Sequence, residues 1–233
     1  IADRGGGGAP GVLTGWREQW CKLRQAFTQK EILLPAVFLF LWQATPTADS
    51  AFFFFTTNEL HFNPEFLGTV RLVTSVAGLG GIWLFQRYLR GIPIRRIFVW
   101  TTVISAGLGL TGLVLVTHAN RALGIDDRWF SLGDSVVLAV AGRIAFMPVL
   151  VLAARLCPEG IEATLFALLM SVLNLGSLLA YQSGAWLTQA LGVTETNFAN
   201  LPALLIVANL STLLPLPLAR WLPDDTVTPN RSR

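Results

Sequence analysis

Long apolar segments recur along this chain and are separated by short polar connections. Residues 97–120, 163–194 and 196–219 form runs of 24, 32 and 24 positions without a single Asp, Glu, Lys or Arg. A helix needs about 20 apolar residues to cross the hydrocarbon core of a bilayer. The pattern therefore predicts an integral membrane protein with an all-α fold, a bundle of membrane-spanning helices.

Six membrane spans are expected between two polar ends. They fall at about 32–57, 66–88, 97–118, 133–154, 163–188 and 201–221, a six-transmembrane-helix bundle over residues 31–222. The first and fourth spans contain charges, but their apolar flanks and the even spacing of the connections favour spans there as well. Residues 1–30, with four consecutive glycines and several basic residues, indicate a cytoplasmic linker, and residues 223–233 a cytoplasmic tail.

Charge is scarce and unevenly placed, which narrows the class of protein and sets its orientation. Only 13% of the residues are charged, against about 25% in a soluble domain. This composition excludes a soluble globular enzyme, a disordered tail and a nucleic-acid-binding module, and the net charge of +3 does not indicate a nucleic acid partner. Of the 17 lysines and arginines, 13 lie at the two ends or in connections on the same side, so both termini are expected to be cytoplasmic.

Three ionisable residues are predicted to lie at membrane depth, namely Asp49, Arg71 and Arg143. Charges there are costly, so they usually face a bundle interior, form pairs or mark a transport pathway. At about 1.5 Å of helix rise per residue, Asp49 and Arg71 both lie about 6 to 7 Å outward of their span centres. We therefore expect an Asp49–Arg71 pair, either a static structural pair or a coupling element in which Asp49 takes up a proton.

Arg143 falls near the centre of the fourth span, without an acidic residue at matching depth. A guanidinium group binds a carboxylate through two parallel hydrogen bonds, so an arginine in this position suits an anionic substrate. A buried structural arginine that is bonded to backbone carbonyls is the alternative.

Uncharged polar residues divide the spans into two sets. The fifth span carries Ser171, Asn174 and Tyr181 at helical spacing, a stripe that indicates either substrate contacts or hydrogen bonds between helices. The third and sixth spans contain no acidic or basic residue. The first, second, fourth and fifth spans are therefore predicted to line a cavity, and the third and sixth to form an outer, lipid-facing set.

The first span contains a polar segment from Gln43 to Ser50, with Pro46 near its middle. Proline removes a backbone donor and kinks a helix, and interrupted helices in mid-membrane are where transporters place binding sites. Gln43 and Thr47 are therefore candidate substrate-binding residues. The four phenylalanines at 52–55 are candidates for stacking on a flat ring, although in a membrane helix such residues more often face lipid or pack.

Catalytic and metal-binding patterns are missing from the sequence. It has no His-Asp or Ser-His set within the spans, no His/Glu metal motif and no paired aspartates across spans. We therefore expect neither an enzyme nor a cofactor or metal.

Three segments together resemble the folate-biopterin transporter family, and its cyanobacterial and plant branch is the most similar. They are residues 45–52 (TPTADSAF), the predicted cytoplasmic loop 156–164 (LCPEGIEAT) and residues 171–176 (SVLNLG). That family belongs to the major facilitator superfamily, whose members have twelve helices in two six-helix halves. The resemblance implies that the six spans are helices seven to twelve, and that the cargo is a folate or a reduced pterin, moved together with protons.

The resemblance also implies roles for individual residues. The glutamate dianion of a folate would meet Arg143 or Arg71, and an aromatic wall would stack on the pterin ring. Glu159, Gly160 and Glu162 would belong to a gating loop. A capping role for Glu162, in the first turn of the fifth span, is the alternative because a carboxylate suits the helix dipole there.

A complete member of the family has six further helices before the glycine-rich segment. This chain is therefore expected to be half of a carrier, with a separate N-terminal six-helix half or a second copy of itself as partner. The alternatives are a non-transporting membrane interaction or regulatory half-protein, and a carrier of another small organic anion. The expected location is the inner membrane of a bacterial (cyanobacterial) cell or, alternatively, the chloroplast envelope, with the termini cytoplasmic or stromal.

Overall fold

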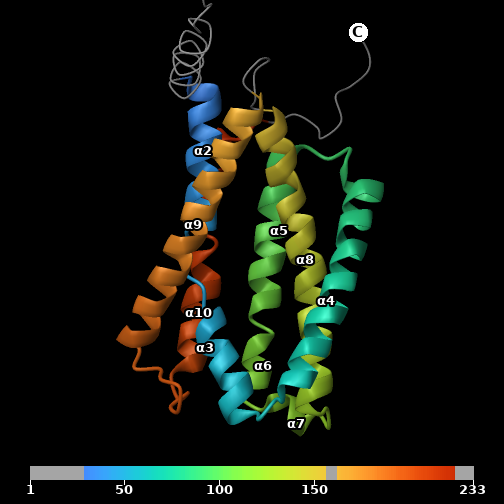
Figure 1. The fold of residues 1–233 in the computed structure, drawn as a ribbon, viewed down its shortest axis with the longest axis vertical. Helices are drawn as coiled ribbons and strands as arrows, with labels where there is room; N and C mark the ends of the chain where they lie inside the picture. Colours follow the sequence, from blue (N-terminus) through green and yellow to red (C-terminus); the bar gives the residue numbers. More distant parts are fainter. Residues whose placement is uncertain (1–28, 156–161, 224–233) are drawn as a thin grey trace, which may run out of the picture.

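The computed structural model describes residues 29–155 and 162–223, and this part of the chain is all-α, without a β-strand (Figure 1). The predicted all-α fold is confirmed. In chain order the elements are α2 (Lys30–Gln43), α3 (Asp49–Phe54), the π-helical η1 (Phe55–Glu59), α4 (Pro64–Leu84), the π-helical η2 (Phe85–Leu89), α5 (Ile94–Gly109), α6 (Gly112–Val116), α7 (Ala119–Ala122), α8 (Asp127–Arg155), α9 (Glu162–Ala190), α10 (Leu201–Ser211) and the 3₁₀-helical η3 (Leu216–Trp221).

Five helical stretches of the described residues are long and apolar enough to cross a membrane. They are Pro64–Leu89, Ile94–Val116, Asp127–Ala154, Ala163–Ala190 and Leu201–Trp221, and they lie over the second to sixth expected spans. The chain is thus a multi-pass membrane protein. The first expected span consists instead of two short helices, α2 and α3, because residues 44–48 between them are not helical.

The helices pack in two groups (Figure 1). In one group α4 and α5 both pack against α8, and in the other α2 packs along α9, with α3 and α10 also in contact with α9. The two groups meet where α10 contacts α5 and α6, and where η3 contacts α2 and α5. This arrangement places the interrupted first span beside α9, within the second group.

Glycines allow α4 and α8 to approach closely. A side-chain carbon added at Gly81 would lie 2.7 Å from the backbone oxygen of Val140, and one at Gly78 would lie 3.1 Å from Cγ of Arg143. Helices in a membrane associate through such small residues because lipid supplies no hydrophobic force between them. The two glycines therefore provide the groove along which the Arg143 side chain lies.

Large apolar side chains cover the outside of the bundle. On α4, Leu72, Leu79 and Trp83 are each at least 60% exposed, and Trp100 of α5 and Trp186 of α9 are equally open. A soluble protein rarely exposes such continuous apolar surface, whereas hydrocarbon accommodates it without cost. The exposed apolar side chains are therefore consistent with a surface that faces lipid.

Candidate functional site

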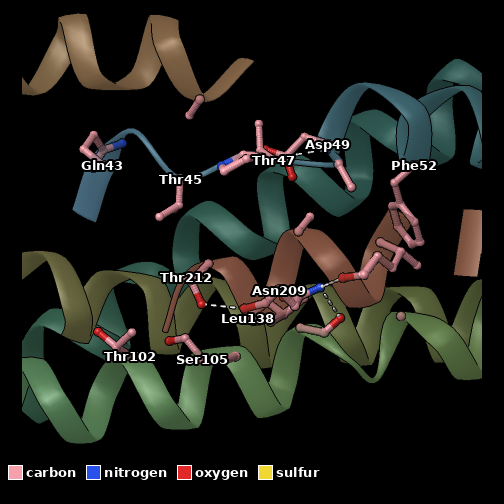
Figure 2. Close-up of a pocket in the computed structure, with 18 of the residues that line it drawn as sticks. Gln43, Thr45, Thr47, Asp49, Phe52, Thr102, Ser105, Leu138, Asn209 and Thr212 are labelled. Atoms are coloured by element: carbon pink, nitrogen blue, oxygen red, sulfur yellow. Dashed lines mark hydrogen bonds between the residues drawn. The ribbon is translucent and has the colours of Figure 1, made fainter. Parts of the chain in front are cut away.

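A polar cavity of about 480 Å³ lies between the two groups of helices (Figure 2). Five of the six predicted spans contribute to its wall, and the second does not. The polar side chains of the wall are Gln43, Thr45, Thr47, Asp49, Thr102, Ser105, Asp134, Ser177, Tyr181, Asn209 and Thr212, and its aromatic side chains besides Tyr181 are Trp42 and Phe52. Such a cavity amid apolar spans is the kind of place where a membrane protein binds a polar ligand.

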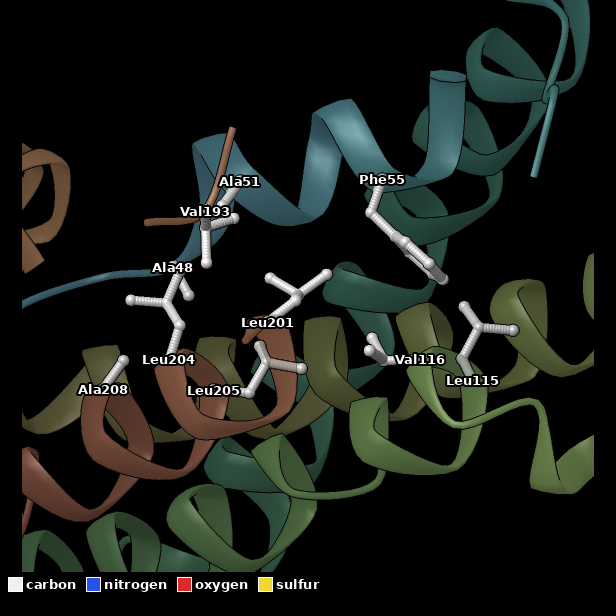
Figure 3. Packing of buried hydrophobic residues seen from close by; sticks show 10 residues of the cluster. All are labelled: Ala48, Ala51, Phe55, Leu115, Val116, Val193, Leu201, Leu204, Leu205 and Ala208. Carbon is white, nitrogen blue, oxygen red and sulfur yellow. The ribbon is translucent and has the colours of Figure 1, made fainter. Parts of the chain in front are cut away.

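Two apolar clusters close the bundle above and below this cavity. One contains Phe55, Leu115 and Leu204 (Figure 3), and the other contains Phe38, Phe98 and others from the opposite ends of the same spans. The residues that line the cavity lie between the residues of the two clusters. This order holds along α5, α8, α9 and α10, which continues into η3. The cavity is therefore at the middle of the bundle, between the two clusters.

The break in the first span forms one wall of the cavity. Pro46 cannot donate to the helical ladder, and its ring clashes with the preceding turn, so the helix stops at Gln43 and resumes at Asp49. The predicted interruption at Pro46 is confirmed, as a full break and not merely a kink in a continuous helix over 32–57. The backbone N–H of Thr47 donates to the carbonyl of Ala180 on α9, at 3.3 Å, and so replaces part of the lost hydrogen bonding.

Close approach of α9 holds this break in place. A side-chain carbon at Gly184 would lie 2.0 Å from the carbonyl oxygen of Thr47, so only glycine fits there. About two turns before Gly184 on α9, the hydroxyl of Ser177 accepts a hydrogen bond from the side-chain amide of Gln43, at 2.8 Å. The hydroxyl of Thr47 accepts from the backbone N–H of Asp49, at 3.2 Å, and fixes the start of α3.

A second break, in the third span, lies across the cavity. After α5 ends at Gly109, the N–H of Leu113 donates to the carbonyl of Leu110 and leaves the Gly109 carbonyl without a helical partner. The side-chain amide of Asn209 on α10 donates to that carbonyl at 3.3 Å, and to the carbonyl of Leu205 at 2.8 Å (Figure 2). Because an unpaired buried carbonyl is costly, Asn209 stabilises the broken helix.

Asp134 of α8 is a cavity residue that sequence reasoning missed. Its carboxylate accepts a hydrogen bond from the hydroxyl of Thr111, which also contacts the carbonyl of Leu108 at the same break. The sequence pattern placed Asp134 at the outer boundary of the fourth span, whereas α8 begins at Asp127. Asp126 is the residue in the sequence that indicates this earlier start of the helix. Its side chain accepts from the backbone N–H of Arg128 at 2.9 Å, as an N-terminal cap does.

The wall of the cavity is acidic. Asp49 and Asp134 are its only charged side chains, and no lysine, arginine or histidine of the described residues lines it. Asp49 lies at an exposed position, whereas Asp134 is partly buried. Any anionic group of a ligand would therefore be repelled from this part of the bundle, and hydrogen-bond donors would be attracted to it.

The two arginines that were expected to meet a substrate lie outside the cavity. Arg71 and Arg143 are both exposed, and neither forms an ion pair among the described residues. The predicted Asp49–Arg71 pair is therefore wrong for this structure. Similar depth did not bring the two together because α3 packs against α9, whereas α4 packs along α8.

The other predicted site residues are divided between the cavity and the outside. Gln43, Thr47 and Tyr181 line the cavity, whereas Ser171 and Asn174 are exposed on α9 and do not. The reason is that α9 turns its small residues, Gly176, Ala180 and Gly184, toward the break in the first span. Glu159 and Gly160 of the expected gating loop lie outside the described residues, and Glu162 is the first residue of α9.

The expected lipid-facing role of the third and sixth spans is also wrong. Thr102 and Ser105 of α5 line the cavity together with Asn209 and Thr212 of the sixth span. The prediction relied on the absence of charged residues, and the polar groups of these spans are uncharged hydroxyl and amide groups. Such groups can also bond to carbonyls of their own helix. The hydroxyl of Thr102 accepts from the indole N–H of Trp42, at 3.2 Å, which links the two sides of the wall.

The fold and this cavity define an α-helical membrane protein with broken helices around a polar interior, an arrangement typical of transporters. Comparison with known proteins identifies the family. The BT1 family model matches residues 7–232, and the chain belongs to that family.

Relatives with assigned names agree with this membership. The chain is 68% identical over 199 residues to a folate-biopterin transporter of Synechocystis, covering 85% of this chain and 40% of that protein. It is 33% identical over 191 residues to folate transporter 2 of Plasmodium falciparum, covering 82% of this chain and 42% of the relative. A probable folate-biopterin transporter of Arabidopsis is 33% identical over 204 residues, covering 87% and 42%.

These matches confirm the resemblance to folate-biopterin transporters. The chain spans about two fifths of the length of the curated relatives it matches. No solved structure matches the chain.

Proposed function

We propose that this chain is the C-terminal six-helix half of a folate or reduced-pterin carrier of the major facilitator type, coupled to protons. Support for the cargo comes from the names of its relatives, which are folate-biopterin and folate transporters. We place the carrier in a bacterial inner membrane or a chloroplast envelope, with both termini cytoplasmic or stromal.

The polar cavity at the interrupted helices is the observation that carries the proposal. Two breaks in spans border the cavity, one at residues 44–48 and one between α5 and α6. At each break a backbone group forms a hydrogen bond with another helix. Non-helical backbone is tolerated at membrane depth only where protein buries it or where it lines a cavity. Broken helices at a polar midpoint are also the elements that secondary transporters use to bind cargo.

A partner for the exposed polar face is part of the proposal. Arg71, Arg143, Ser171 and Asn174 are exposed on α4, α8 and α9, yet they belong to spans surrounded by apolar residues. Charged groups facing hydrocarbon are costly, so this face is expected to meet protein or water. An N-terminal six-helix half, or a second copy of the chain, would cover it and enclose a pathway between the halves. The exposed Arg143 and Arg71 would then meet the carboxylates of the substrate.

Proton coupling is assigned to Asp49. This carboxylate lines the cavity at the first residue of α3, directly after the break in the first span. Movement of α3 relative to α2 would open this carboxylate to one side of the membrane or to the other. In a coupled cycle Asp49 takes up a proton when open to one side and releases it when open to the other.

Uptake of labelled folate by the intact gene product tests this function. Arg143→Ala and Asp49→Asn are expected to reduce gradient-driven uptake about tenfold or more, because each removes a charge that contacts cargo or proton. The matched control is Arg128→Ala, a charge in the first turn of α8 whose guanidinium lies 5.9 Å from the ring centre of Phe66. Wild-type uptake by both the Arg143→Ala and the Asp49→Asn variants would refute the site assignment. Absence of folate and pterin uptake by the unmodified protein would refute the cargo.

A further inference from the structure

We infer that Asp134 binds the pterin ring of the cargo inside the cavity, so that the glutamate end points out toward Arg143 and Arg71. This inference rests on the proposed function and adds the orientation of the cargo to it. Its basis is the distribution of charge, since the described wall of the cavity carries two carboxylates and no basic group, whereas both arginines lie outside.

The two ends of a folate differ in the partners they require. A pterin ring is neutral and has two neighbouring donors on one edge, the ring N3–H and the 2-amino group. An ionised carboxylate accepts on both oxygens and can pair with two such parallel donors, as it does with a guanidinium group. The glutamate end is a dianion, which two carboxylates in one cavity would repel. Only the ring end therefore suits the cavity.

The groups around Asp134 complete a site for such a ring. One carboxylate oxygen accepts from Thr111 and keeps a second lone pair, and the other oxygen is also open to a ligand, so both can accept from the two ring donors. The amide N–H groups of Asn209 are used on the carbonyls of Leu205 and Gly109, and its oxygen packs against Gly109. The hydroxyl of Ser105 is buried in the same wall without any hydrogen-bond partner. It can donate to the ring carbonyl that neighbours N3.

Aromatic side chains provide the flat surface that a ring needs. Trp42 lines the cavity and is held by its indole hydrogen bond to Thr102 and by an edge contact with Phe98, with ring centres 5.7 Å apart. Phe52 lines the cavity from α3 (Figure 2). Stacking on a held aromatic ring favours flat heteroaromatic groups without regard to their charge. The glutamate has no ring that could stack on these side chains.

Displacement of labelled folate from the purified, full-length protein tests the orientation. Two unlabelled competitors are used, biopterin, which has the ring without glutamate, and p-aminobenzoylglutamate, which has glutamate without the ring. With Asp134→Asn, biopterin is expected to compete about tenfold less well, while p-aminobenzoylglutamate is unchanged. Arg143→Ala is the matched variant, for which the opposite pattern is expected.

A second ligand pair makes the contact itself measurable. The 2-desamino analogue of folate lacks one of the two donors, so the wild-type protein is expected to bind it about tenfold more weakly than folate. Asp134→Asn is expected to remove most of that difference, because the partner of the missing group has changed. If this variant is not recovered in membranes, Thr111→Val replaces it, with a smaller loss expected for biopterin alone.

The outcomes separate the two proposals. Equal loss of both competitors on Asp134→Asn, or loss of p-aminobenzoylglutamate alone, would overturn the orientation. So would an unchanged discrimination against the 2-desamino analogue. If the unmodified protein bound neither folate nor biopterin, the proposed function itself would fail. Folate binding with a reversed competitor pattern would leave that function intact and refute only the inference.

Discussion

Polar groups around the cavity and on the exposed face of α4 and α8 differ in whether they have bonding partners. At the cavity, the Asn209 amide donates to the Gly109 carbonyl that a helix break has freed, and the Thr111 hydroxyl donates to Asp134. On the outer face, Arg71 and Arg143 form no ion pair within the described residues and are exposed. The difference teaches that polar groups around the cavity find hydrogen-bond partners on neighbouring helices, whereas the charged groups of the outer face have no ion-pair partner among the described residues.

The same comparison separates residues needed for folding from residues needed for cargo. Variants inside the cavity are expected to lower both stability and binding, because the hydrogen bonds there hold the broken spans together. Variants on the outer face are expected to lower binding while leaving stability unchanged.

The largest effect is expected where the break in the first span touches α9. In Gly184→Ala the added carbon would lie 2.0 Å from the Thr47 carbonyl oxygen, so α9 or the break must move. We expect a loss of about 3 kcal/mol in the free energy of unfolding, measured by thermal unfolding in detergent, with loss of folate binding. Gly107→Ala is the control, because nothing lies within 4 Å of the carbon that it adds. Equal unfolding temperatures for the two variants would contradict this account of the packing.

The next effect is expected at the second break. Asn209→Leu keeps the size of the side chain but leaves the Gly109 carbonyl without its partner, which should cost about 1–2 kcal/mol of stability. The same thermal measurement tests it. Ser211→Ala serves as control because its hydroxyl bonds only to the carbonyl of Ala208 within the same helix. A smaller loss for Asn209→Leu than for Ser211→Ala would show that the break is held by other contacts.

A smaller effect is expected between α2 and α9. The Gln43–Ser177 hydrogen bond, at 2.8 Å, is a single contact between uncharged groups, and such bonds in membranes contribute about 0.6 kcal/mol. A double-mutant cycle with Gln43→Leu and Ser177→Ala measures it from the unfolding free energies. A coupling energy of zero would mean that close packing at Gly176 and Gly184, not this hydrogen bond, positions α2.

The smallest effect on stability is expected at the outer face. Arg71→Gln should leave the unfolding temperature unchanged, because the side chain is exposed and has no ion-pair partner in residues 29–155 and 162–223. Displacement of labelled folate by p-aminobenzoylglutamate should nevertheless weaken in this variant. A clear loss of stability would show that Arg71 has a structural role inside the chain, and the contrast between the two regions would then fail.

Much of the architecture could be read from the sequence because the bilayer restricts what a chain can form. Apolar runs in a membrane must be helical, since no water is available to bond the backbone. The all-α fold and the interruption at Pro46 followed from that rule and from the chemistry of proline. Three of the predicted site residues, Gln43, Thr47 and Asp49, line the cavity because the break itself places them there.

The rest of the site depended on how each helix is rotated and which helices are neighbours. A span that faces lipid and one that faces another helix are both apolar, so the pattern does not indicate which side turns inward. Tertiary packing decided that Asp134 and Asn209 enter the cavity, that Ser171 and Asn174 do not, and that Asp49 and Arg71 stay apart. The sequence by itself determined where the second to sixth spans lie and that the first is interrupted at Pro46, because those features depend on local chemistry. Only the tertiary structure decided which polar groups meet, because that depends on contacts between distant helices.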